Sequence, residues 1–323
     1  MAAHSRAELD ALRRSLRVPL VVAPMFMVSN PRLVVAALRA GVIAAFPSIN
    51  ARTPQLFEEW LAEIQWERGS FTSQDRTLPP FAVNLLTHAT NTRFPPDLEI
   101  VARRRPPIVI TSVGPPDRVV EIVHGYGGFV FADVASLHHA KKAAAADVDG
   151  LVLLCAGAGG QTGRLNPFAF IDAVRSFFEG LLLVAGSITN GRQIRALQVA
   201  GADLGYCGTS FIGATESSSN EIYRRALIDS QIDDVWDTNA ISGIPANLLR
   251  QSLDAIGLTP GDRWIAKEGK MDWSKVHWRP DLYSAGHGVG AVTKSQACAQ
   301  IIEQFAIDYR AAGTQILMDS SLG

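Results

Sequence analysis

The stretch "LLLVAGSITNGRQIRALQVAGADLGYCGTS", residues 181–210, decides the fold of this chain. It contains an apolar run (181–187), a helical pattern (191–200) and a second apolar run (204–210). Each apolar run is almost continuous rather than alternating, as is typical of parallel strands that are covered on both faces. The stretch is therefore a strand–helix–strand unit with glycines where each strand ends.

The same unit recurs along the chain. Apolar runs that end in Gly, Pro, Ser or Asn alternate with helical patterns, several of which have proline in their first turn. The predicted strands are 19–25, 42–48, 81–86, 107–113, 128–134, 150–156, 181–187 and 204–210. This regular alternation predicts an α/β fold, a (β/α)8 TIM barrel, although a doubly wound sheet could use the same pattern.

The pattern changes after the eighth strand. We predict that residues 1–216 and 286–323 form the barrel, and that residues 217–285 form a helical insertion covering its C-terminal mouth. The apolar segment 295–312 then closes the chain as a helix. It could pack on its own barrel or on a second subunit, so a homodimer stays an open alternative.

Composition excludes several classes of partner. The chain has 323 residues, 47% of them hydrophobic, and a formal net charge of −1. Near-neutral charge argues against nucleic acid or an anionic membrane as the main partner. The three cysteines are widely spaced in apolar runs, which predicts neither disulfides nor a metal site and favours a reducing compartment. With no signal-peptide pattern and no long apolar span, we expect a cytoplasmic protein.

The barrel directs attention to the residues after each strand, because active sites of this fold lie at the C-terminal ends of the strands. Gly186 and Ser187 follow the seventh strand, and Gly208 and Thr209 follow the eighth. Loops at these two places often bind phosphate through backbone N–H groups. These residues therefore predict a phosphate site, the alternative being glycines that only make tight turns.

The loop "GAGGQTG" (157–163) looks like a dinucleotide fingerprint, but it is not one. Thr162 stands where the third glycine is required, and no acidic residue follows about twenty positions later at a strand end. What remains is a loop with few side chains, against which a flat ring could lie.

At these residues the chain resembles the nitronate monooxygenase family, formerly called 2-nitropropane dioxygenases. These are FMN-containing barrels, related to flavin-dependent enoyl-ACP reductases and NADH:quinone reductases. The resemblance rests on five segments: "APMFMVS" (23–29), "FAVNLL" (81–86), "GAGGQTG" (157–163), the block 184–217, and "YSAGHGVG" (283–290). The block 184–217 is the most specific.

The resemblance implies noncovalent FMN at the C-terminal mouth. By motif position, the isoalloxazine ring would lie against Ala23, Pro24 and Met25, and Asn84 would lie near the ring or the ribityl chain. The phosphate would be bound by four residues: Gly186, Ser187, Gly208 and Thr209. Gly159, Gly160 and Gln161 would line the reactive face of the flavin. Asp133 ends the fifth strand, where some relatives have a lysine. It could contact the ribityl hydroxyls or cap the next helix.

Most members of the family carry "GGH" in the sixth loop, where this chain has "GGQ". An amide forms hydrogen bonds but cannot remove a proton near neutral pH, so Gln161 makes abstraction from a neutral nitroalkane doubtful. His287, in "SAGHGVG", is a candidate replacement for the missing histidine, the alternative being a structural histidine.

These observations predict an FMN-dependent nitronate monooxygenase that oxidises alkyl nitronates with O2. Oxidation of an already anionic nitronate needs no base, and Gln161 would only orient the nitro group. One alternative is an NAD(P)H-dependent reductase of an enoyl thioester or quinone, with Gln161 polarising a carbonyl. The other is a flavin-binding protein without turnover.

Overall fold

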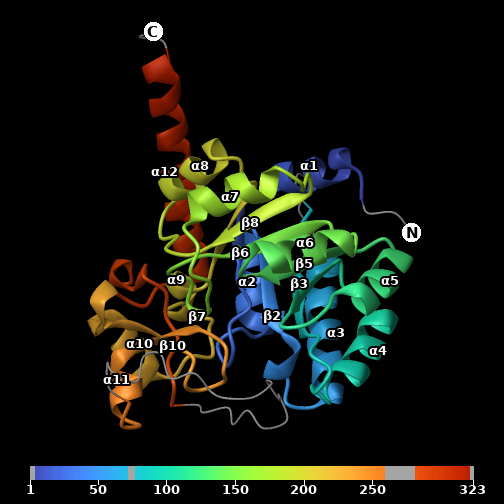
Figure 1. The fold of residues 1–323 in the computed structure, drawn as a ribbon, viewed down its shortest axis with the longest axis horizontal. Helices are drawn as coiled ribbons and strands as arrows, with labels where there is room; N and C mark the ends of the chain where they lie inside the picture. Colours follow the sequence, from blue (N-terminus) through green and yellow to red (C-terminus); the bar gives the residue numbers. More distant parts are fainter. Residues whose placement is uncertain (1–3, 72–76, 259–280, 321–323) are drawn as a thin grey trace.

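The computed structural model describes residues 4–71, 77–258 and 281–320. Its central feature is a closed barrel of parallel strands (Figure 1). The barrel strands are β1 (Leu20–Val22), β2 (Ile43–Pro47), β3 (Ala82–Leu86), β4 (Ile108–Ser112), β5 (Phe129–Val134), β6 (Gly150–Leu154), β8 (Leu181–Ala185) and β9 (Leu204–Cys207). Each lies within one of the predicted runs. The pairing of Val21 in β1 with Tyr206 in β9 closes the barrel, so the TIM-barrel prediction is confirmed and the doubly wound sheet is excluded.

Helices surround the barrel, and several of them begin at a residue whose side chain caps the first turn. In α8 the side chain of Asn190 accepts a hydrogen bond from the backbone of Gln193, and in α2 Asn30 precedes a proline at the first helical position. The helices of the barrel are α1 (Arg6–Arg14), α2 (Pro31–Ala40), α3 (Pro54–Ser70), α4 (Phe94–Arg104), α5 (Asp117–Gly125), α6 (Leu137–Ala145), α7 (Pro167–Arg175), α8 (Gly191–Val199), α9 (Thr209–Ile212) and α12 (Cys298–Ser320).

The two ends of the barrel are closed differently. At the N-terminal end, α1 packs Leu9 and Leu12 against inward-facing strand residues such as Val21 and Ile43. At the other end lie residues 221–254, which follow β9 in the chain, so α1 and this segment occupy opposite ends of the molecule (Figure 1). The C-terminal mouth is therefore the end available for a site.

The described part of the predicted insertion contains two α-helices, α10 (Glu221–Asp229) and α11 (Arg250–Asp254), and two strands that the sequence analysis did not predict. These strands are β10 (Val235–Thr238) and β11 (Ala246–Leu249). They form a three-stranded antiparallel sheet with β7 (Gly160–Gln161), a strand in the loop after β6. An expectation of helices alone was wrong here, because strands of four residues are too short to show a period.

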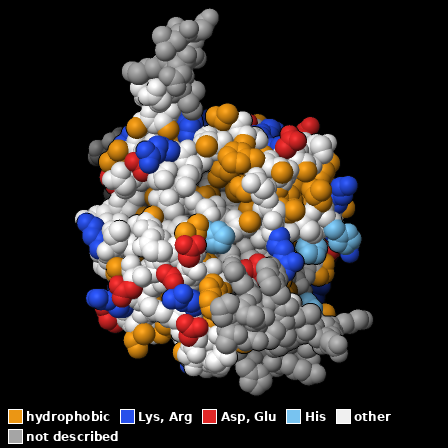
Figure 2. All heavy atoms as spheres, turned by 60° about the vertical axis from the view of Figure 1, so that its left-hand side comes forward, with side chains coloured by type: hydrophobic (Ala, Val, Ile, Leu, Met, Phe, Trp, Pro, Cys, Tyr) orange, Lys and Arg blue, Asp and Glu red, His pale blue; other side chains and the backbone are white. Residues whose placement is uncertain are grey.

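No helix among the described residues is long and apolar enough to cross a membrane. On the face shown in Figure 2, basic and acidic side chains are interspersed, as expected for a net charge near zero.

Candidate functional site

One cavity of about 320 Å³ opens at the C-terminal ends of the barrel strands. Residues of the barrel and of the segment after β9 line it together, including Tyr223, Ile241, Ala246 and Leu248. Every residue predicted for the site except His287 lines this cavity: Ala23, Pro24, Met25, Asn84, Asp133, Gly159, Gly160, Gln161, Gly186, Ser187, Gly208 and Thr209. The barrel thus brings together residues that lie far apart in the sequence.

The loops after β8 and β9 (residues 186–190 and 208–209, the rim loops) present bare backbone to the cavity. Gly186 has φ +135°, and a Cβ there would lie 2.9 Å from the carbonyl oxygen of Ala156. Ser187 has φ +58°, a conformation that non-glycine residues rarely adopt and that often marks a functional loop. Within the described chain, the N–H groups of Gly186, Ser187, Gly208 and Thr209 donate to no protein acceptor. Such free donors can bind a phosphate group.

His287 lies behind the rim rather than in the cavity lining. Its N–H donates to the carbonyl oxygen of Gly157 at 3.0 Å. A Cβ at Gly157 would lie 2.9 Å from Nδ1 of His287 and 2.6 Å from Oγ of Ser187. The neighbours Gly286 and Gly288 line the cavity instead. The lining therefore gives no support to the predicted catalytic role of His287.

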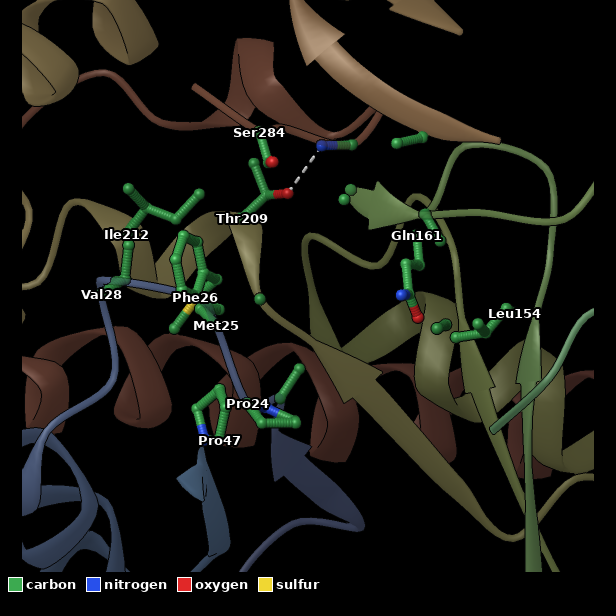
Figure 3. A pocket seen from close by; sticks show the side chains of 18 of the residues that line it. Pro24, Met25, Phe26, Val28, Pro47, Leu154, Gln161, Thr209, Ile212 and Ser284 are labelled. Carbon is green, nitrogen blue, oxygen red and sulfur yellow. Dashed lines mark hydrogen bonds between the residues drawn. The ribbon is translucent and has the colours of Figure 1, made fainter. Parts of the chain in front are cut away.

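The loop after β1 supplies an apolar wall, which a side chain from the next unit holds in shape. Pro24, Met25 and Phe26 line the cavity, with Pro47 beside them and Gln161 on the opposite side (Figure 3). Asn50 donates from Nδ2 to the carbonyl oxygens of Met25 (2.9 Å) and Ser29 (2.8 Å). It also accepts from the N–H of Met27 at 2.9 Å. Sequence reasoning missed Asn50, although it closely follows the second predicted strand.

Three polar side chains on the neighbouring strands β3, β4 and β5 form the floor network: Asn84, Ser112 and Asp133. Nδ2 of Asn84 donates to Oγ of Ser112 at 2.6 Å, and Ser112 donates to Oδ2 of Asp133 at 2.5 Å. Oδ1 of Asp133 is shielded from solvent and has no hydrogen-bond partner among the described residues. Oη of Tyr206, which also lines the cavity, is likewise buried and has no hydrogen-bond partner among the described residues. These two buried polar atoms are available for hydrogen bonds to a ligand bound on this floor.

Asp133 does not cap the helix that follows it. The N-cap of α6 is Ser136, whose side chain accepts from the N–H of His139. The helix-capping alternative for Asp133 was therefore wrong. Burial raises the pKa of Asp133 to about 7, against the opposite effect of the hydrogen bond from Ser112.

The loop after β6 (residues 155–163, the β6 loop) takes its shape from the segment after β9. Gln161 pairs with Ala246 and Gly160 pairs with Asn247 in the β7–β11 ladder. The buried Asn247 donates from Nδ2 to the carbonyl oxygen of Ala158 at 2.7 Å and to Oγ1 of Thr162 at 3.2 Å. Sequence reasoning could not have identified Asn247, because its partners lie more than eighty positions away.

The segment "SAGHGVG" packs directly on the β6 loop. A Cβ at Gly159 would lie 2.6 Å from the backbone nitrogen of Gly286, and one at Gly286 would lie 2.5 Å from the carbonyl oxygen of Gly157. The N–H of Gly286 donates to Oγ1 of Thr209 at 2.9 Å, the bond drawn in Figure 3. Glycine is required on both sides because two backbones touch here. This contact links the β6 loop to the rim loops.

The cavity contains few groups that can exchange a proton. Its titratable side chains among the described residues are Asp133, Tyr206, Cys207 and Tyr223. Burial raises the pKa of Cys207 to about 11, and it also raises the pKa values of Tyr206 and Tyr223 above the ordinary value of a phenol. For Tyr206 the charge of Asp133 acts in the same direction as burial. At neutral pH the thiol and the phenols stay protonated, and only Asp133 titrates in that range.

These features fit an FMN molecule. The bare N–H groups of the rim loops suit its phosphate, and the uncovered polar atoms of the floor suit the polar edge of its ring. The apolar wall at Pro24, Met25 and Phe26 suits a flat aromatic surface. Gln161 faces that wall across the cavity (Figure 3).

Comparison with known proteins agrees with this geometry. The family model described as nitronate monooxygenase matches residues 12–257. A curated nitronate monooxygenase from Paraburkholderia phytofirmans is 28% identical, over 86% of this chain and 83% of the relative. One from Pseudomonas aeruginosa is 27% identical, over 65% of this chain and 70% of the relative.

Solved structures share the fold. A nitroalkane oxidase from Streptomyces ansochromogenes superposes with a TM-score of 0.81 at 21% identity, covering 95% of this chain and 99% of that one. FabK from Thermotoga maritima superposes with a TM-score of 0.77 at 20% identity, covering 97% and 99%. At these identities the likeness concerns the architecture alone.

Proposed function

The chain belongs to the nitronate monooxygenase family and is a flavin-dependent oxidoreductase, and we propose that it uses FMN to oxidise alkyl nitronates with O2. The observation that carries this proposal is the family match over residues 12–257, which contains nearly all of the cavity lining. When bound, FMN would supply the redox chemistry of electron acceptance and reaction with O2.

The protein would hold FMN with the residues predicted for it. The N–H groups of the rim loops bind the phosphate, and Asn84 and Asp133 contact the polar part of the flavin. Ala23, Pro24 and Met25 support the ring, and Gly159 and Gly160 leave room beside its reactive face.

Gln161 would orient the substrate. Its amide can donate a hydrogen bond to a nitro oxygen, which fixes the reacting carbon without any proton transfer. The described lining holds no histidine, lysine or glutamate, and its carboxyl group, Asp133, belongs to the barrel wall. A substrate that arrives as an anion fits a site with no base at position 161.

The apolar surroundings exclude water from the reacting atoms. Leu154, Ile212, Ile241 and Leu248 line the cavity together with the β1 loop. Small alkyl groups are the substituents that such walls accept. We accordingly propose short-chain alkyl nitronates as the substrate class.

Anaerobic stopped-flow spectroscopy of the FMN-loaded protein tests the proposal. We expect a nitronate to bleach the flavin absorbance within the time of one turnover, and NADH to leave it unchanged. Rapid bleaching by NADH alone would contradict the proposal and favour a reductase of an enoyl thioester or quinone. A flavin that neither compound bleaches would indicate a binding protein without turnover.

A further inference from the structure

The hydrogen bonds of the floor network run in one direction. Nδ2 of Asn84 donates to the carbonyl oxygen of Ile110 at 3.2 Å as well as to Oγ of Ser112. Because a backbone carbonyl can only accept, the orientation of the Asn84 amide is fixed. Ser112 accepts from Asn84 and so gives its single hydrogen to Oδ2 of Asp133. Oδ2 is therefore an acceptor, and a proton bound to Asp133 must lie on Oδ1.

Among the described residues, Ser112 is the one group that donates a hydrogen bond to Asp133. The groups that face it are Ser112 and Asn84 on one side and the phenol of Tyr206, from β9, on another. Among the described residues that line the cavity there is no lysine, arginine or histidine. A buried carboxylate without a positive partner is unfavourable, whereas the neutral acid is readily accommodated.

We propose that Asp133 carries a proton on Oδ1 and donates it in a hydrogen bond to an acceptor atom of the flavin ring, a carbonyl oxygen or a ring nitrogen. This inference rests on the proposed function only in that it places a flavin in the cavity. Asp133 is thus a cofactor-binding residue that adjusts how readily the ring accepts electrons.

The charge of Asp133 changes with pH in a way that affects reduction. On the acidic side of about pH 7 the proton is already in place, and it stabilises the extra electron density of the reduced ring. On the alkaline side Asp133 is ionised, so the arrival of two electrons on the ring draws one proton from water onto Oδ1. Reduction coupled to this proton makes the midpoint potential fall more steeply with pH.

The test is the midpoint potential of the FMN-loaded protein as a function of pH, measured by reductive titration with a reference dye. We expect the wild type to lose potential more steeply on the alkaline side of about pH 7, with one additional proton taken up for two electrons. Asp133→Asn, which cannot ionise, should lack this additional slope. Equal slopes in the wild type and Asp133→Asn would overturn the inference.

Two further variants separate proton binding from a general disturbance of the floor. Tyr206→Phe removes a hydroxyl that does not titrate near neutral pH, so the steeper slope should persist. Ser112→Ala removes the hydrogen bond that favours the carboxylate, so the steeper region should begin at higher pH. A slope lost in Tyr206→Phe, or an unshifted onset in Ser112→Ala, would contradict the assignment.

Proton binding can also be observed without the cofactor. Infrared difference spectra between the wild type and Asp133→Asn should show a protonated carboxyl band that disappears as the pH rises through about 7. Absence of the band would overturn the inference. None of these measurements uses a nitronate, so a failed nitronate assay with an intact pH effect would refute only the proposed substrate. Failure to bind FMN would refute both proposals.

Discussion

The rim loops and the β6 loop line the same cavity, but they are built in different ways. The rim loops come from residues 186–190 and 208–209, within a single strand–helix–strand unit, and they present backbone N–H groups. The β6 loop presents the side chain of Gln161, whose position depends on Asn247 and on the segment around Gly286. The comparison teaches that the proposed phosphate site is a local property of the chain, whereas the proposed reactive face requires contacts between distant segments.

A change in the rim should have the largest effect on the cofactor. In Gly186→Ala the new Cβ would lie 2.9 Å from a backbone oxygen at φ +135°, strain of about 1–3 kcal/mol that the loop can relieve only by moving. We expect FMN binding to weaken by about 100-fold, which corresponds to about 2.7 kcal/mol, as measured by flavin fluorescence titration.

The matched control is Gly208→Ala. Its Cβ would meet the flexible side chain of Met25 at 3.3 Å, so the variant should fold and bind FMN more tightly than Gly186→Ala. Wild-type affinity in Gly186→Ala would show that the rim loops do not hold the phosphate.

A change in the β6 loop should alter the reaction and leave the cofactor bound. Gln161→His restores a proton carrier, so we expect kcat/KM for a neutral nitroalkane to rise by about 100-fold, with FMN affinity unchanged. The rate with the matching nitronate should change little, since that substrate needs no base.

Gln161→Asn is the control for this prediction, because it keeps the amide and shortens its reach. If nitroalkane turnover fails to rise in Gln161→His, the absence of a base at this position is not what limits the enzyme.

Asn247→Ala tests the long-range support of the β6 loop. The variant loses two buried hydrogen bonds, which should lower the free energy of unfolding by about 2 kcal/mol and kcat/KM for a nitronate by about 10-fold. Denaturant titration and steady-state kinetics measure the two effects, and FMN affinity should stay near that of the wild type.

Ser5→Ala removes the N-cap of α1 and provides a control at the opposite end of the barrel. It should cost about 1 kcal/mol of stability without a kinetic effect. If Asn247→Ala weakens FMN binding as much as turnover, the β6 loop and the rim loops are not separable.

The last prediction concerns the pH dependence of stability. Because the pKa of Asp133 is raised from about 4 in the unfolded chain to about 7 in the folded protein, the folded state binds more protons in between. The contribution of Asp133 to the free energy of unfolding is complete at acid pH and is lost as the pH rises towards about 7. The melting temperature of the protein without FMN should fall over this pH range, and it should fall less in Asp133→Asn. An equal fall in the wild type and the variant would contradict the raised pKa of Asp133.

The sequence predicted the barrel and the residues of the rim because both depend on local patterns. Continuous apolar runs mark buried parallel strands, and the glycines at 186 and 208 mark where two of them end. The strand ends then gather at one mouth as a property of the fold.

The features that the sequence did not predict depend on contacts between distant segments. Strands β10 and β11 are too short to show a period, and the partner of β11 on its other side is β7, more than eighty positions away in the sequence. Asn247 and Asn50 support cavity loops through hydrogen bonds to backbone groups in other segments of the chain, and a single sequence does not show these partners. His287 was a candidate for catalysis with a structural role as the alternative, and its ring lies beside Gly157, outside the cavity lining.

The central claim is that the rim loops and the floor network hold one FMN molecule in this cavity. The most direct measurement is to purify the protein, release any bound flavin by denaturation, identify it by chromatography, and titrate the resulting apoprotein with FMN. The account predicts FMN bound at one molecule per chain, with affinity lost in Gly186→Ala. A protein that carries no flavin and does not bind added FMN would contradict it.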